Sequence, residues 1–273
     1  MLRKLLKYEF KDTARVIPFL YLITLFFAAI TFILEKIGLA WLTITSSVIL
    51  LIIGISVIIV TFVVVVMRFH KNLYSNEGYL MFTLPVKPKF LLVSKTIAAF
   101  CWIIASIIVF IGALCVVLYG FGVGSSEFSK MMSEMEKFGL EKVIFAFIPL
   151  MLISILYLLS QIFFAITVAN RPVFQGLGIG GAFLVFLATY VVLKIAESIA
   201  SIFVPFSLVY SLEGNPDIAL TTKNMFGYLL DSINGINPTT VTLGLGGFVF
   251  VVIMICVLFF LTGRMMSKKI SLK

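Results

Sequence analysis

Long apolar runs alternate with short polar segments along the whole chain. A helix needs about 20 mostly apolar residues to cross the hydrocarbon core of a bilayer. The runs that approach or exceed this length without Asp, Glu, Lys or Arg are Val16–Leu34, Leu42–Met67, Thr96–Val123, Val143–Val168, Gly176–Leu193 and Val241–Leu261. The pattern predicts an all-α integral membrane protein with six membrane-spanning helices in a single transmembrane domain, residues 1–273.

The first 15 residues have the periodicity of an amphipathic helix, which is expected to lie in the headgroup plane of a membrane. Its apolar face consists of Leu2, Leu5, Leu6, Phe10 and Thr13. Its basic face consists of Arg3, Lys4, Lys7, Lys11 and Arg15. Glu9 falls on the apolar face, where it either extends toward the membrane surface or pairs with a nearby lysine, or forms a salt bridge to another helix or a partner chain. Because the next apolar run is long enough to span, we expect an uncleaved start.

Composition and charge support this class and set an orientation. The chain is 62% hydrophobic and 12% charged, whereas soluble domains are about half apolar and about a quarter charged. With a cytoplasmic N-terminus, the inner segments 1–15, 68–95, 169–175 and 262–273 carry 15 of 21 basic residues and 3 of 12 acidic ones. The positive-inside rule therefore predicts that both termini are cytoplasmic. The net charge of +9 then reflects topology and attraction to anionic membrane lipids, not nucleic-acid binding.

Two outer connections contain apolar residues that are not needed for spanning. Ser125–Lys142 has helical spacing of Phe and Met, and predicts a helix that rests on the outer leaflet or forms a lid. Ser198–Leu212 is 15 residues long with Pro205 near its middle, which is too short to span comfortably. We expect it to be an interfacial or re-entrant segment within the extracellular connection Lys194–Thr240.

The residues for enzymatic or metal chemistry are scarce. His70 is the single histidine, and the three cysteines lie in apolar runs without metal-ligand or disulfide spacing. No Ser/His/Asp set and no metal site is expected, so the chain is not predicted to be an enzyme by itself. The predicted spans contain no acidic or basic side chain for ion coupling, and Lys194 and Glu197 at the end of the fifth are spaced for a local salt bridge.

Glycine patterns point to helix packing and not to nucleotide binding. A G-x-G-x-x-G match begins at Gly176, but it opens a membrane span and follows no strand. Gly176 and Gly180 instead have the spacing of close helix contacts, as do Gly120 and Gly124. There is no G-x-x-x-x-G-K-[ST] sequence, so ATP is not expected to bind this chain.

The longest inner loop, Arg68–Lys95, contains the half-polar segment Asn76–Lys89, NEGYLMFTLPVKPK. Pro85 and Pro88 forbid a continuous helix, but a short helix fits Asn76–Leu84. Such an element either docks a partner protein or anchors the loop to the membrane.

This loop resembles the first cytoplasmic loop of ABC-2-type permeases, the membrane subunits of certain bacterial ABC transporters. The similarity lies in the E-G-Y-L-x-F-T-L-P-V-x-P run and the closing S-K, from Glu77 to Lys95, and is strongest to permeases of Firmicutes. The opening Lys7–Tyr21 and the six-span layout also resemble that family. The resemblance implies a multi-pass protein of the bacterial plasma membrane.

The family implies a role for each segment. The N-terminal helix would be the elbow helix, with Arg3, Lys4, Lys7, Glu9, Phe10 and Lys11 at the membrane interface. The loop would form a coupling helix that docks on a separate ATPase subunit. Its coupling residues would be Glu77, Gly78, Tyr79, Leu80, Phe82, Thr83, Leu84, Pro85 and Lys87. Two permease chains, as a homodimer or heterodimer, and two ATPase subunits holding ATP and Mg would export a peptide, antibiotic or lipid-like substrate. The residues alone also allow an ion-coupled or passive carrier and a non-transporting sensor or scaffold.

Overall fold

The computed structural model describes residues 2–74, 88–122, 127, 129–130, 133–134, 140–171, 178–211, 218–222, 224–233 and 240–267. Within this part of the chain, six helices are long and apolar enough to cross a membrane, which confirms the predicted number of spans. They are α2 (Ile17–Ile37), α3 (Ala40–Tyr74), α5 (Pro88–Gly120), α7 (Leu140–Ala169), α8 (Gly178–Phe203) and α10 (Gly246–Ser267). The protein is therefore a helical, multi-pass membrane protein.

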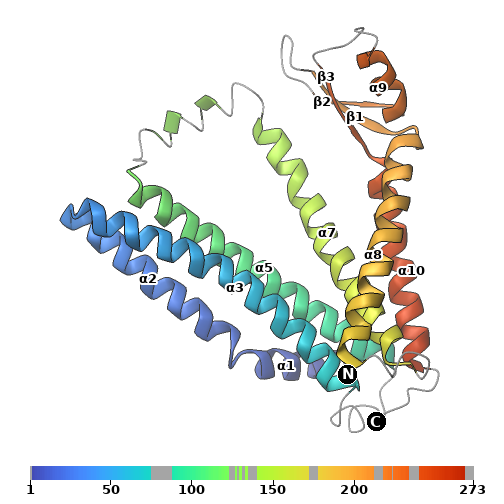
Figure 1. The fold of residues 1–273 in the computed structure, drawn as a ribbon, viewed down its shortest axis with the longest axis horizontal. Coiled ribbons are helices and arrows are strands. Elements are labelled where there is room, and N and C mark those ends of the chain that lie inside the picture. Colours follow the sequence, from blue (N-terminus) through green and yellow to red (C-terminus); the bar gives the residue numbers. More distant parts are fainter. Residues whose placement is uncertain are drawn as a thin grey trace. The chain divides into compact units, whose positions relative to one another are not determined.

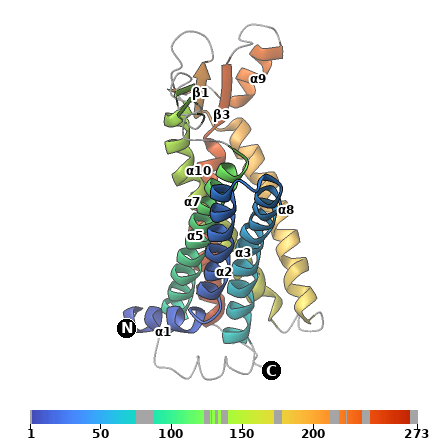
Figure 2. The same ribbon diagram turned by 90° about the vertical axis from the view of Figure 1, so that its left-hand side faces the viewer.

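The chain folds as two compact units. The first contains α1 (Leu2–Thr13), α2, α3 and α5, and the predicted N-terminal helix is present as α1. The helices α2, α3 and α5 pack against one another side by side, and α1 lies across one end of them (Figures 1 and 2). That end is where α2 begins, α3 ends and α5 begins.

The helices α3 and α5 are longer than a bilayer requires. With 35 and 33 residues they extend for roughly 52 and 50 Å, against a hydrocarbon core of about 30 Å. The predicted spans 42–67 and 96–123 thus continue as helix toward residues 75–87, and α5 begins at Pro88, where a missing N–H does no harm. A rigid helix therefore flanks this loop on either side.

Small residues let the first unit pack closely, as in other membrane helix bundles. A Cβ placed on Gly120 would lie 2.3 Å from Ser47 Oγ and 3.3 Å from Thr43 Cγ2, so α5 approaches α3 closely enough that a side chain there would displace Ser47. The predicted packing role of Gly120 is confirmed. A Cβ on Gly180 would meet nothing within 4 Å, so the chain makes no close contact at that glycine, and Gly176 lies outside the described residues.

The second unit contains α7, α8 and α10, which pack on one another, with a small sheet and α9 (Met225–Ile233). The strands are β1 (Ser207–Ser211), β2 (Ile218–Thr221) and β3 (Thr240–Gly244). They form an antiparallel sheet in the order β2-β1-β3, with Val209 opposite both Ala219 and Thr242. The sheet follows α8 and precedes α10 (Figure 1).

The sequence did not predict this small sheet within the otherwise helical protein. The segment Ser198–Leu212, expected to be interfacial or re-entrant, does not form one element: its first part completes α8 and its second part is β1. Pro205 separates the two because a proline disfavours helical geometry in the residue before it and cannot donate to the helix. The last helix begins at Gly246 and not at the predicted Val241, because residues 240–244 form strand β3. This strand is rich in Val and Thr, and β-branched residues favour strands.

Candidate functional site

The predicted coupling residues, Glu77 to Lys87, lie outside the described residues, as does most of the predicted outer helix Ser125–Lys142. The structure instead describes the two helices on either side of residues 75–87. The helix α3 ends at Tyr74 and α5 begins at Pro88, and α1 crosses beside them. The candidate site is therefore the junction of α1 with α3 and α5.

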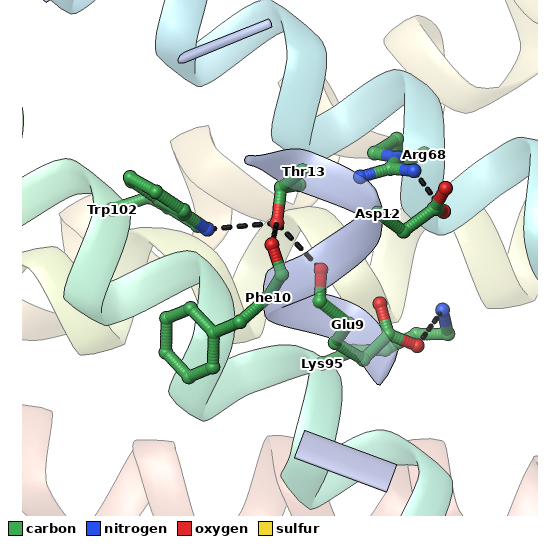
Figure 3. A network of polar contacts seen from close by, with 7 residues as sticks. All are labelled: Glu9, Phe10, Asp12, Thr13, Arg68, Lys95 and Trp102. Carbon is green, nitrogen blue, oxygen red and sulfur yellow. Dashed lines mark hydrogen bonds and ion pairs between the residues drawn. The ribbon is translucent and has the colours of Figure 1, made fainter. Parts of the chain in front are cut away.

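Two ion pairs tie α1 to the helices that frame the loop (Figure 3). Lys95 Nζ on α5 lies 2.6 Å from Glu9 Oε1, and the two side chains are only 4% and 12% exposed. Arg68 on α3 pairs with Asp12, whose side chain is 59% exposed. Glu9 thus forms the salt bridge to another helix, one of the two alternatives that the sequence leaves open. Burial makes its pair the stronger constraint, because solvent screens it less.

Thr13 and Trp102 form a third connection. Trp102 Nε1 on α5 donates a hydrogen bond of 2.8 Å to Thr13 Oγ1, which itself donates to the carbonyl oxygen of Glu9 at 2.5 Å. The Phe10 ring packs on the Trp102 ring, with 5.9 Å between their centroids (Figure 3). The apolar face of α1 therefore ends on an indole whose one polar group is satisfied.

The hydrogen bonds continue from Trp102 into the bundle. Tyr21 Oη on α2 donates to the Trp102 carbonyl at 3.2 Å and lies 2.8 Å from Ser106 Oγ on α5. Ser106 Oγ in turn donates to Thr61 Oγ1 on α3 at 2.8 Å, and both of these residues are fully buried. The polar network of the junction therefore reaches all three spans of the first unit.

The basic residues predicted for the membrane interface remain at the surface. Arg3, Lys4, Lys7 and Lys11 are exposed on α1, whereas Glu9 and Phe10 are half-buried against α5. A shallow cavity of about 260 Å³ lies between α1 and α3 and is lined by Tyr8, Glu9, Lys11, Asp12, Arg15 and Asn72. Helix α1 thus packs one face on the protein and leaves its basic face exposed.

Glu9 and Phe10 were predicted site residues, whereas their partners Lys95 and Trp102 and the pair of Asp12 and Arg68 were not. One signal was available in the sequence. Lys95 is a charged residue directly before a long apolar run, and it could neutralise Glu9 on the apolar face of the first helix. Among the described residues, no group of His, Cys, Asp or Glu is arranged to hold a metal ion. Comparison of the chain with protein-family models, with curated proteins and with solved structures found no match.

Proposed function

We propose that this chain is the membrane-spanning permease subunit of an ATP-binding cassette exporter, in which a separate ATPase subunit hydrolyses ATP. The loop sequence from Glu77 to Lys95 motivates the proposal, through its resemblance to ABC-2-type permeases. The observation that supports it most is mechanical. Two helices longer than the bilayer, α3 and α5, lead directly into that loop, and α1 is joined to α5 by the buried pair of Glu9 and Lys95 and to α3 by the pair of Asp12 and Arg68.

The mechanism follows from this frame. Closure of two ATPase subunits on ATP pulls the paired coupling loops together. A rigid contact is needed to pass on the movement, and Tyr79 and Phe82 supply bulky side chains for it. Because α3 and α5 are continuous helices, the pull tilts them as rods, and α1 moves with them. A cavity between two permease chains then opens outward, and ATP hydrolysis resets it.

Two experiments test the proposal. Purification of the chain from its native membrane in mild detergent should recover an ATPase subunit with a P-loop sequence. In the reconstituted complex, the double variant Tyr79→Ala/Phe82→Ala should still hydrolyse ATP but no longer transport substrate. Its helix content and elution volume should stay those of the wild type. A double variant with normal coupling would refute the assignment of the loop. Transport by the chain without any ATPase would instead identify an ion-coupled or passive carrier.

A further inference from the structure

A pocket of about 370 Å³ lies within the second unit, where α7, α8 and α10 meet α9 and the end of β3. Its volume is in the range of small-molecule sites. Its polar lining consists of Glu197, Ser154, Ser198 and Ser201, and its apolar lining includes Ile202, Met225, Phe248 and Val251. The lining therefore combines one carboxylate with apolar side chains.

Each serine hydroxyl of the pocket already donates its proton to the protein. Ser154 Oγ donates to the carbonyl of Leu150 at 2.9 Å, and Ser198 Oγ donates to that of Lys194 at 2.9 Å. Ser201 Oγ donates to the Gly244 carbonyl at 3.2 Å. A hydroxyl has a single proton but two lone pairs. These three oxygens therefore present only acceptors to a ligand.

Glu197 adds the charge. A carboxylate accepts hydrogen bonds through about four lone-pair positions, and Lys194 Nζ occupies one on each oxygen, at 2.9 and 3.0 Å. The Lys194 side chain is 51% exposed, so this pair is weak and open to exchange. Acceptor positions on both oxygens of Glu197 thus remain for a second donor.

Glycines hold the pocket in shape. A Cβ on Gly247 would lie 3.1 Å from Ser201 Cβ and 3.6 Å from Glu197 Cγ, so the first turn of α10 packs directly against the polar side of the pocket. The Glu197 carboxylate on this side of the pocket repels an anionic ligand.

We propose that this pocket binds a protonated primary amine carried on an apolar chain. The ammonium group, with three N–H donors and no acceptor, matches the carboxylate of Glu197 and the serine oxygens. The apolar chain lies along Met225, Phe248 and Val251, which would otherwise face the open pocket. This inference stands on the pocket alone and does not require the chain to be an ABC permease.

Decylamine is a suitable probe because it has one ammonium group and one apolar chain. The full-length protein in phosphatidylcholine nanodiscs should bind tritiated decylamine saturably, above the partitioning of empty discs. Glu197→Gln should weaken this binding at least tenfold, because it removes the charge and keeps the shape. Glu35→Gln, a matched loss of a carboxylate outside the pocket lining, should leave it unchanged, and Lys194→Gln should preserve or tighten it.

Competition and a second variant keep the test decisive. Unlabelled decylamine should displace the probe, whereas decanol and decanoate should not. If Glu197→Gln lowers the yield of monodisperse protein, Ser154→Leu replaces it, because Ser154 is exposed and a leucine there fills the pocket; it should abolish saturable binding. Full affinity in the monodisperse variant used, or equal competition by decanol, would overturn the proposal.

The lipid in the disc identifies the source of the amine. Phosphatidylethanolamine carries a primary ammonium group on an apolar body, as decylamine does. If its addition to the discs lowers the apparent affinity for decylamine, the occupant in the membrane is the lipid headgroup. If the affinity is unchanged, the occupant is a non-lipid amine. Both results require saturable binding that depends on Glu197.

Discussion

The buried ion pair between α1 and α5 should contribute far more to stability than an exposed pair of similar geometry. In Glu9→Gln the amide cannot neutralise Lys95, whose side chain is only 4% exposed. The exposed pair of Lys194 and Glu197 provides a matched control within the same chain, with a comparable distance of 2.9 Å. Both substitutions replace a glutamate by its neutral isostere, but the first pair is buried between two helices and the second is a more exposed pair within one helix.

The magnitude follows from the distance and the burial. At 2.6 Å and an effective dielectric constant of about 20, Coulomb attraction is about 6 kcal/mol. Desolvation of the two ions offsets much of this, but it is not recovered when only one partner is removed, and breaking a buried pair costs about 3–5 kcal/mol. We expect Glu9→Gln to lower the free energy of unfolding by about 3 kcal/mol. For Glu197→Gln we expect about 0.5 kcal/mol.

Trp102 provides the measurement, because its indole donates to Thr13 of α1 and reports the docking of that helix. In a Trp41→Phe background it is the remaining tryptophan of the chain. Titration with SDS in mixed micelles, followed by Trp102 emission, gives the free energy of unfolding of each variant. The double variant Glu9→Lys/Lys95→Glu exchanges the two charges. Its free energy of unfolding should be about 2 kcal/mol higher than that of the less stable of the single variants Glu9→Lys and Lys95→Glu.

Two results would refute this reasoning. If Glu9→Gln costs no more than Glu197→Gln, the burial of the first pair has no energetic consequence. If the exchanged double variant is no more stable than the less stable single exchange, the interaction between the two charges is not what holds α1 to α5. A loss of helix content in the single variants before SDS is added would be measured separately by circular dichroism.

Two further predictions concern the packing of the first unit. Gly120→Ala should lower the free energy of unfolding by about 1–2 kcal/mol, because its Cβ would displace Ser47. Gly112→Ala has open space around its Cβ and should be neutral or slightly stabilising. Equal effects of the two variants in SDS unfolding would contradict the close approach of α5 to α3. Ser106→Ala should cost about 1 kcal/mol because it removes the hydrogen bond to Thr61 Oγ1, and a Thr61→Ala/Ser106→Ala double variant should cost less than the two single losses added, which a double-mutant cycle measures.

The prediction of the helices succeeded where the signal was local. An uninterrupted apolar run identifies a span without reference to any other part of the chain, because backbone groups in a bilayer must be satisfied within one helix. The ends of the spans were less predictable. Lys194 and Glu197 suggested the end of a span, yet α8 continues to Phe203, because two charges that neutralise each other do not stop a helix.

The short sheet was missed for a related reason. Its strands have four or five residues each. The 15 residues Ser198–Leu212 resemble one apolar segment, although Pro205 divides them into the end of a helix and a strand. Whether Val209 lies in a strand depends on a partner, Thr242, that is 33 positions away along the chain. Such pairing leaves no periodic signal in segments this short.

The sequence by itself determined the membrane class, the six spans, the amphipathic first helix and the expectation that Glu9 needs an opposite charge, because hydrophobic length and helical periodicity are properties of neighbouring residues. Only the tertiary structure decided that Lys95 is the partner of Glu9, that Gly120 and not Gly180 is a close contact, and that Glu197 faces a pocket whose serine protons are all engaged. These are facts about distance and burial between segments remote in the chain, and no local pattern contains them.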